Sequence, residues 1–127
     1  MVFCLTAGTF VATLAVQSFT LTWIHSVEKT EIQEDYSLAG ERLLLTEARI
    51  KTSGAGFDPP PGATLDGSWW RWQPHTTLDA VTLARAAAPG EWRICVHNGC
   101  QPLSQYLPDG ESEAPVRIAA CPVKAQP

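Results

Sequence analysis

Residues 19–38 alternate between apolar and polar side chains and predict two antiparallel strands joined by a turn. Successive side chains of a strand point to opposite faces of a sheet. On the first strand, one face takes Phe19, Leu21, Trp23 and His25. On the returning strand, one face takes Ile32, Glu34, Tyr36 and Leu38, and the other takes Glu31, Gln33 and Asp35. This pattern predicts a hairpin whose mainly apolar face lies at a core.

Short strands separated by turn signals recur along the rest of the chain. Further strands are expected at residues 2–6, 9–16, 68–72, 81–85, 92–96 and 116–121. Turn signals stand at Ala7-Gly8, Asp66-Gly67, Pro89-Gly90, Asn98-Gly99 and Asp109-Gly110. Residues 102–107 are expected to form a short helical turn or a short strand. The sequence therefore predicts an all-β fold, a single-domain antiparallel β-sandwich or small barrel of roughly eight or nine short strands.

Two of these strands carry predictions about which side chains share a face. Residues 41–51 are compatible with a helix, but their alternation favours a strand with Leu44, Thr46, Ala48 and Ile50 on one face. The other face then takes Leu45, Glu47, Arg49 and Lys51. In residues 69–72, Trp70 and Trp72 are expected to pack in the core, with Arg71 against an aromatic ring on the other side.

Length and composition limit the class of protein. A chain of 127 residues with 45% apolar and 17% charged side chains is expected to form one domain over residues 1–127, with a loose tail at 122–127. The net charge of −4, without a cluster of Lys and Arg, argues against a nucleic-acid partner or an anionic membrane surface. Residues 1–22 carry no charge, but polar residues interrupt them, so neither an export signal nor a transmembrane segment is expected.

The spacing of the cysteines leaves two interpretations open. Cys95 and Cys100 flank the Asn98-Gly99 pair, a frequent signal for a tight hairpin turn. A four-residue loop would allow a cross-strand disulfide, whereas a two-residue Asn98-Gly99 loop would pair Cys95 with Pro102 and leave reduced thiols. One close pair of cysteines with scattered histidines is poor support for zinc, so no metal and no cofactor are expected.

Polar side chains in phase with core residues indicate a candidate site. His25 and Glu34 are expected to meet across the hairpin, either as a structural hydrogen bond or as a general base, His25, oriented by a carboxylate. Ser26 points to the opposite face from His25, and the chain has no Gly-x-Ser-x-Gly motif, which argues against serine hydrolase chemistry.

A glycine-rich segment and a hairpin lysine complete this candidate site. Residues 53–56 could offer backbone N–H groups to an anion, and Lys29 could add a positive charge. We call the predicted site the polar corner and define it by His25, Ser26, Lys29, Thr30, Glu34, Gly54 and Gly56. It is expected to bind a transporter partner or a small anionic solute, and the alternative is a small enzyme that uses His25 and Glu34.

Two sequence motifs carry a resemblance to a known family. They are the string His25-Ser26-Val27-Glu28-Lys29-Thr30, followed by Glu34 and Tyr36, and the string Ser53-Gly54-Ala55-Gly56-Phe57. Over nearly its whole length the chain resembles the bacterial domain-of-unknown-function family 1850. The resemblance implies an accessory role beside tripartite TRAP-type transporters of the TAXI class, which use an extracytoplasmic solute-binding protein and a fused permease. It further implies a non-catalytic, extracytoplasmic protein.

Overall fold

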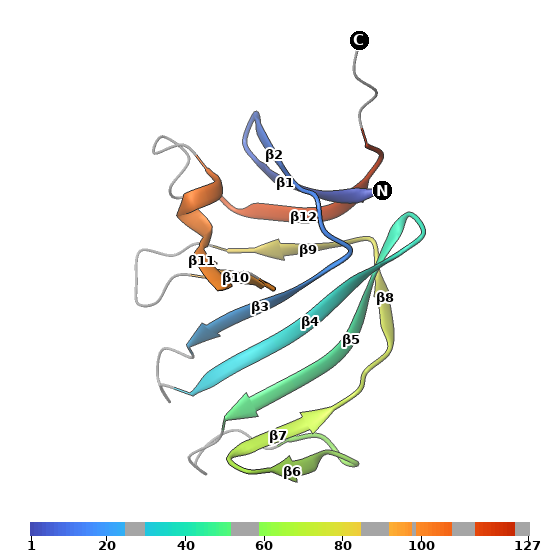
Figure 1. The fold of residues 1–127 in the computed structure, drawn as a ribbon, viewed down its shortest axis with the longest axis vertical. Coiled ribbons are helices and arrows are strands. Elements are labelled where there is room, and N and C mark those ends of the chain that lie inside the picture. The colour runs from blue at the N-terminus through green and yellow to red at the C-terminus, as the bar shows by residue number, and fades with distance from the viewer. Residues whose placement is uncertain (25–29, 52–58, 85–91, 98, 108–113, 124–127) are drawn as a thin grey trace.

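The computed structural model describes residues 1–24, 30–51, 59–84, 92–97, 99–107 and 114–123 (Figure 1). Its strands are β1 (Val2–Ala7), β2 (Phe10–Leu14), β3 (Ser18–Ile24), β4 (Glu31–Ala39), β5 (Arg42–Lys51), β6 (Thr64–Asp66), β7 (Trp69–Trp72), β8 (Thr76–Leu78), β9 (Ala80–Leu83), β10 (Arg93–Val96), β11 (Gly99–Pro102) and β12 (Val116–Cys121). A single turn of 3-10 helix, η1, spans Leu103–Tyr106. No helix among the described residues is long and apolar enough to cross a membrane.

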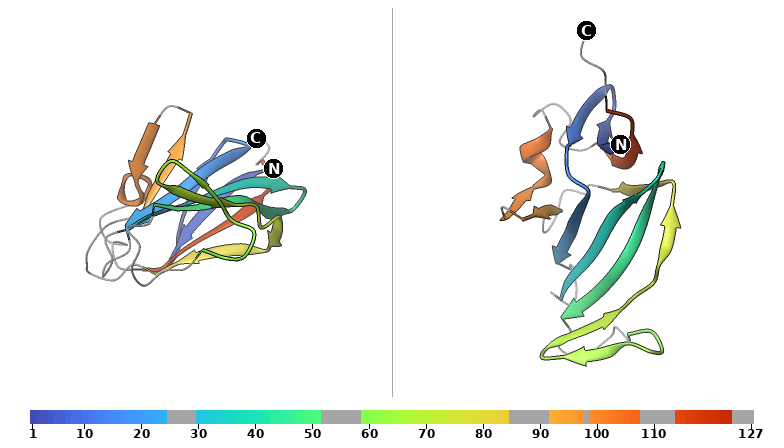
Figure 2. Two further views of the ribbon diagram at one scale, coloured as in Figure 1. Left: turned by 90° about the horizontal axis from the view of Figure 1, so that it is seen from below. Right: turned by 45° about the vertical axis from the view of Figure 1, so that its right-hand side comes forward.

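The strands form two antiparallel sheets, which confirms the predicted all-β sandwich. The small sheet has the strand order β2-β1-β12-β9. The large sheet has the order β11-β10-β3-β4-β5-β7-β6, and β8 also pairs with β5. The large sheet extends beyond the small one, so β6 and β7 lie at the end of the molecule opposite to β1, β2 and β12 (Figures 1 and 2).

The core lies between the small sheet and the β10-β3-β4-β5 part of the large sheet. Phe3 of β1 meets Phe19 of β3 edge to face, with ring centroids 4.7 Å apart, and Phe19 stacks on Tyr36 of β4 at 5.5 Å. Such aromatic pairs add to the free energy of burying apolar surface. Other large, fully buried side chains of this cluster come from both sheets and η1: Leu5, Leu21, Leu43, Ile94, Leu103, Val116 and Ile118.

The hairpin predicted from residues 19–38 is confirmed. β3 and β4 pair in continuous antiparallel register from Ser18 opposite Ser37 to Ile24 opposite Glu31. Phe19, Leu21 and Tyr36 point into the core, as the alternation requires. We call this side of the large sheet its inner face. The opposite side, which carries Thr20, Thr22, Glu31, Gln33 and Asp35, is its outer face.

A β-bulge changes the faces of β5 relative to the sequence prediction. Asp35 lies opposite Glu47 but Tyr36 lies opposite Leu45, so Thr46 is an extra residue between them. Its hydroxyl donates to the backbone carbonyl of Asp35 at 3.2 Å. Because one inserted residue reverses the alternation, the prediction that Leu44 shares a face with Ala48 and Ile50 is wrong.

The described residues form twelve strands where the sequence suggested eight or nine, because three short ones carry little pattern of their own: β6, β8 and β11. β6 and β7 form a hairpin whose turn contains Gly67 at φ 64°, a conformation that glycine adopts without strain. Trp70 and Trp72 share the inner face with Ile50 and Ala48, but both are only partly buried and neither belongs to the main core cluster. The cation over Trp69 is Lys51, at 5.9 Å from the ring centroid, whereas Arg71 instead bonds carboxylates.

Candidate functional site

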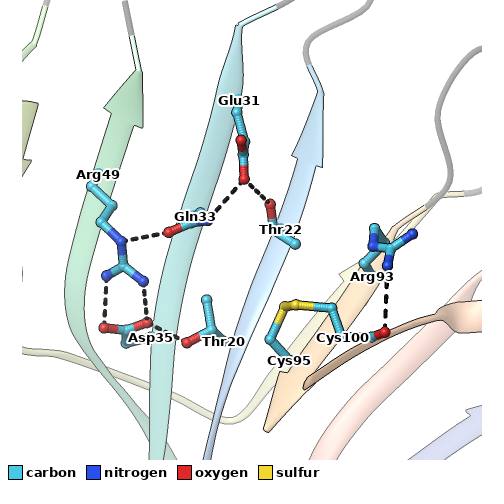
Figure 3. The surroundings of a disulfide bond; sticks show 9 residues. All are labelled: Thr20, Thr22, Glu31, Gln33, Asp35, Arg49, Arg93, Cys95 and Cys100. Carbon is cyan, nitrogen blue, oxygen red and sulfur yellow. Dashed lines mark hydrogen bonds and ion pairs between the residues drawn. A yellow bond between two sulfur atoms is a disulfide. The ribbon is translucent and has the colours of Figure 1, made fainter. Parts of the chain in front are cut away.

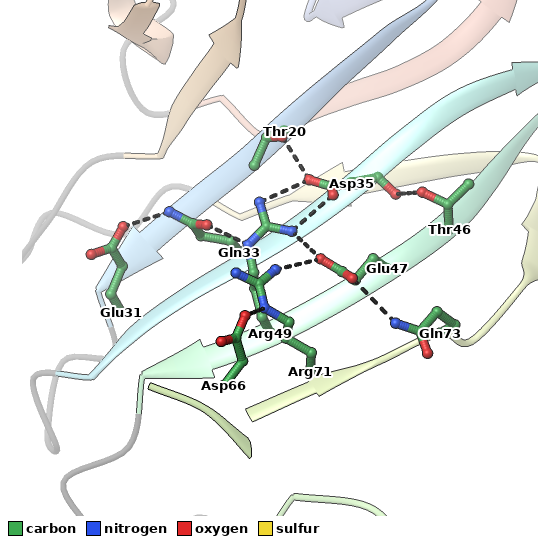
Figure 4. Close-up of polar contacts among 10 residues, drawn as sticks. All are labelled: Thr20, Glu31, Gln33, Asp35, Thr46, Glu47, Arg49, Asp66, Arg71 and Gln73. Carbon is green, nitrogen blue, oxygen red and sulfur yellow. Dashed lines mark hydrogen bonds and ion pairs between the residues drawn. The ribbon is translucent and has the colours of Figure 1, made fainter. Parts of the chain in front are cut away.

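A continuous set of polar contacts crosses the outer face of the large sheet from β3 to β6 (Figure 4). We call it the outer array, and its members are Thr20, Glu31, Gln33, Asp35, Glu47, Arg49, Asp66, Arg71 and Gln73. Its members come from five strands, β3 to β7, and Gln73 follows directly on β7. It is therefore a property of the assembled sheet rather than of any one segment.

Strand register brings these side chains together. Gln33 lies opposite Arg49, and Arg49 lies opposite Arg71 on the next strand. One row along, Asp35 lies opposite Glu47. Directly opposed residues have Cβ atoms about 5 Å apart and diagonal neighbours remain within reach of long side chains. Asp35 and Glu47 therefore form a row next to that of Gln33, Arg49 and Arg71. On the diagonals, Arg49 meets Asp35 and Arg71 meets Glu47.

Arg49 is the centre of the outer array. Its Nη1 and Nη2 donate to both oxygens of Asp35, at 2.8 and 3.1 Å, and Nη1 also donates to Glu47 at 2.7 Å. Its Nε donates to the side-chain oxygen of Gln33 at 2.6 Å. The side chain is only 13% exposed. Burial alone would lower the pKa of Arg49, but the hydrogen bonds and charges of Asp35 and Glu47 raise it, so the guanidinium stays charged and fixed in orientation.

Arg71 extends the outer array toward the edge of the sheet. Its Nη1 donates to Glu47 at 2.9 Å, and its Nε donates to Asp66 of β6 at 3.1 Å. Glu47 thus bridges Arg49 and Arg71, and its second oxygen accepts a hydrogen bond from Gln73 at 3.2 Å. Asp66 is far more exposed than Glu47. Exposure therefore increases along the array from Arg49 to the β6 edge.

The Asp35 carboxylate is ionised in spite of its partial burial. Burial would raise the pKa of Asp35, but hydrogen bonds from Arg49 and Thr20 and the positive charges of Arg49 and Arg71 outweigh it and hold the pKa below its ordinary value. The Thr20 hydroxyl donates to Asp35 Oδ1 at 2.6 Å. Asp35 is therefore a fixed negative charge on β4, next to the bulge at Thr46 of β5.

An open cleft of about 450 Å³ lies beside this bulge. Its lining includes Thr20, Asp35, Thr46, Cys95 and His97. Bulges re-aim side chains and are frequent beside functional sites. The hydroxyls of Thr20 and Thr46 and the Asp35 carboxylate make much of the cleft lining polar. This composition is suited to binding a polar group rather than an apolar ligand.

Cys95 and Cys100 are joined by a disulfide that lies near Thr20 (Figure 3). Cys95 lies opposite Cys100 and Val96 opposite Gly99, so His97 and Asn98 separate the paired residues. Pro102 lies opposite Arg93, and the alternative that pairs it with Cys95 is wrong. The turn begins one residue earlier than Asn98-Gly99, which brings the two sulfur atoms together. Asn98 itself lies outside the described residues.

A second disulfide joins Cys4 of β1 to Cys121 of β12. These strands pair with Val2 opposite Cys121 and Cys4 opposite Ala119, so the two cysteines are diagonal neighbours on the outward face of the small sheet. Sequence reasoning missed this bond. The signal that could have found it is the pairing of the first strand with the last, because one cysteine lies near each end of the chain.

The structure describes only part of the predicted polar corner. Five of its members lie outside the described residues: His25, Ser26, Lys29, Gly54 and Gly56. Thr30 is buried. Glu34 lies on the inner face opposite Leu21 and Ala48 and accepts a hydrogen bond from the Tyr36 hydroxyl at 2.9 Å. The contact between His25 and Glu34 remains a prediction.

Burial governs the chemistry of Glu34. It raises the pKa of the Glu34 carboxyl, and the hydrogen bond from Tyr36 only partly offsets this effect. Burial together with the charge of Glu34 also raises the pKa of Tyr36 well above its ordinary value, so the phenol remains a donor. Among the described residues, no group of three or more His, Cys, Asp and Glu side chains could hold a metal ion.

Comparison with known proteins gives one match, and it covers the large sheet. No curated protein and no solved structure matches the chain. Residues 19–103 match a family described as a domain of unknown function, DUF1850. The match runs from β3 to the start of η1 and includes the outer array, the cleft and the Cys95–Cys100 hairpin. Because it spans more than half of the sequence, the chain belongs to the DUF1850 family.

Proposed function

We propose that this protein is a non-catalytic binding domain that acts outside the cytoplasm as an accessory of a TRAP-type solute uptake system of the TAXI class. The observation that carries the proposal is the outer array. It presents charged side chains in a fixed arrangement on one face of a sheet, next to a polar cleft. The link to TRAP-type transport rests on the resemblance of the sequence motifs.

The geometry of the outer array supports binding of a protein partner. Arg49 and Arg71 are each held by two carboxylates, so little side-chain entropy remains to be lost when a partner docks. Complementary charge across an interface gives specificity and speeds association. Asp66, at the β6 end of the array, is the most exposed of its ion-paired residues and the charge most accessible to such a partner.

The cysteines support the proposed compartment. All four are paired, in the Cys4–Cys121 and Cys95–Cys100 disulfides. Disulfides persist in oxidising compartments such as the bacterial periplasm and are rare in the reducing cytoplasm. An extracytoplasmic site of action would also place the protein beside the solute-binding component of a TRAP-type transporter.

The polar corner is a second proposed contact, for a small anionic solute. Thermal melts with small carboxylates and phosphate would test it, because a ligand of the native state raises the melting temperature by mass action. We expect stabilisation of the wild type that is lost in His25→Ala. The enzyme alternative is less supported, since Glu34 accepts a hydrogen bond from Tyr36 on the inner face of the sheet.

The chain offers a matched pair of variants for testing the partner proposal. Asp66 and Asp79 each accept a hydrogen bond from the Nε of an arginine, at 3.1 and 3.0 Å, and are 71% and 83% exposed. Asp66 belongs to the outer array, whereas Asp79 pairs with Arg42 away from it. Reversing the charge at either position costs little stability because both ion pairs are exposed.

The experiment is a binding measurement between the purified chain and the TAXI-type solute-binding protein and permease expected beside it. We expect saturable binding that Asp66→Lys weakens about tenfold or more, and that Asp79→Lys leaves unchanged. Binding that is equally sensitive to both variants would remove the outer array from the interface. Absence of binding to both transport proteins would contradict the proposed function.

A further inference from the structure

The sheet edges of this protein differ in how they are protected against other strands. Within the part of the chain that the structure describes, β2, β6, β8, β9 and β11 each have one side without a strand partner. An unpaired edge presents free N–H and C=O groups and is a template for pairing with another strand. Natural proteins protect such edges by charge, proline or short length.

Four of the five edges have such protection. β6 and β8 have three residues each, and β6 carries Asp66. β9 has four residues and follows directly on Asp79. β11 has four residues and ends at Pro102, which lacks a backbone N–H group. These edges are therefore poor templates for another strand.

β2 is the exception. It is the longest of these edges, with five residues, and no charged side chain or proline occurs from Thr9 to Val16. Val11 is 56% exposed, and Thr13 is also exposed on the same face. Phe10, Ala12 and Leu14 face the core but are only partly buried, which is expected at an open edge. Figure 1 shows β2 at the end of the small sheet, beside β1 alone.

We propose that β2 pairs antiparallel with β2 of a second copy of this chain, so that two four-stranded small sheets become one continuous sheet. A two-fold axis through Ala12 pairs all five residues of the strand. It places Phe10 opposite Leu14 on the core side and Val11 opposite Thr13 on the outer side. Such an interface is isologous and closed, as in most homodimers.

The absence of charged side chains on β2 favours a second copy of this chain, rather than a strand of another protein, as the partner of this edge. A strand that pairs with its own copy places identical charges close together, and like charges opposite one another are destabilising. β2 carries none, so self-pairing sets no like charges of the strand opposite one another. The apolar Phe10–Leu14 contacts extend both cores across the axis. A five-residue edge buries a modest area, so we expect association that depends on protein concentration.

The test compares two double variants with the same chemistry at two different edges. Val11→Lys/Thr13→Lys places lysine opposite lysine across the proposed axis. Thr64→Lys/Leu65→Lys likewise replaces one threonine and one aliphatic residue by lysine on β6, where Leu65 is 58% exposed and Thr64 is also exposed. All four side chains are exposed, and thermal melts of both variants verify that the fold is retained.

Sedimentation equilibrium over a range of protein concentrations gives the readout. We expect the wild type and the β6 variant to rise from 13.8 kDa toward twice that mass as concentration increases. We expect the β2 variant to remain at the monomer mass. A wild type that stays monomeric at every concentration overturns the proposal. A β2 variant that associates as the wild type does also overturns it.

Discussion

Glu34 and Asp35 are neighbours on β4 that point to opposite faces of the large sheet and have pKa values shifted in opposite directions. Burial raises the pKa of Glu34 on the inner face. On the outer face burial acts in the same sense, but Arg49, Thr20 and Arg71 outweigh it and lower the pKa of Asp35. The two carboxyl groups therefore have opposite effects on how stability depends on pH.

Replacing Glu34 by Gln should increase stability at neutral pH. Because the pKa of Glu34 is higher in the folded than in the unfolded state, its protonation stabilises the fold below the unfolded pKa of about 4.3. This stability is lost as pH rises through the folded pKa. Glutamine keeps an oxygen that can accept the Tyr36 hydrogen bond and carries no charge to bury. We expect Glu34→Gln to melt above the wild type at pH 7 and close to it near pH 4. The exposed Glu41→Gln is the control, and an equal gain there would contradict this account.

Removing the Tyr36 hydroxyl should destabilise the protein through Glu34. Tyr36→Phe leaves a partly buried carboxylate without its donor, which costs about 1–3 kcal/mol. In the Glu34→Gln background the loss should be smaller, because a neutral amide is less costly to leave unpaired. A double-mutant cycle from urea unfolding measures this coupling. Equal losses in both backgrounds would show that Glu34 does not depend on Tyr36.

Asp35→Asn should destabilise the outer array, in a pH-dependent manner. It removes one of the two ionic partners of Arg49, whose side chain is largely buried, and we expect a loss of about 1–3 kcal/mol at pH 7. Because the pKa of Asp35 is lower in the folded than in the unfolded state, its ionised form stabilises the fold above the unfolded pKa of about 3.9. This stability is lost as pH falls through the folded pKa. The variant should therefore approach the wild type in strong acid. Asp79→Asn, in an exposed pair, should change stability by less than about 0.5 kcal/mol.

The two disulfides should contribute unequally to stability. Cys4 and Cys121 are 117 residues apart in sequence, and Cys95 and Cys100 only 5. The entropy removed from the unfolded chain grows with loop length, so we expect losses of about 5 kcal/mol for Cys4→Ser/Cys121→Ser and about 2 kcal/mol for Cys95→Ser/Cys100→Ser. Urea unfolding of both variants measures the difference, and a larger loss from the second would contradict this ranking.

The fold class and the central hairpin followed from sequence because alternation specifies which residues share a face. The outer array did not follow, although Glu31, Gln33 and Asp35 were placed on one face. Its contacts depend on the register between β4, β5 and β7, which alternation does not specify. The bulge at Thr46 was missed for a related reason, since one inserted residue leaves no mark in a hydrophobic pattern. The Cys4–Cys121 bond required knowing that β1 pairs with β12.

The predicted polar corner shows a second limit of sequence reasoning. Alternation correctly placed Glu34 on the inner face, from which a contact with His25 was inferred. The structure adds a contact that alternation did not predict, a hydrogen bond to Glu34 from Tyr36, two residues along the same strand. His25 lies outside the described residues, so its contact with Glu34 stays a prediction.

The most direct test of the proposed function is the affinity of the chain for the proposed partner, a TAXI-type solute-binding protein, measured at increasing salt concentration. An interface formed by the exposed charges of the outer array should weaken steadily with salt, because exposed charges are screened. Asp66→Lys should bind more weakly than the wild type at low salt, and the difference should shrink at high salt. Affinity that is independent of salt and unchanged by Asp66→Lys would contradict the assignment of this face as the binding surface.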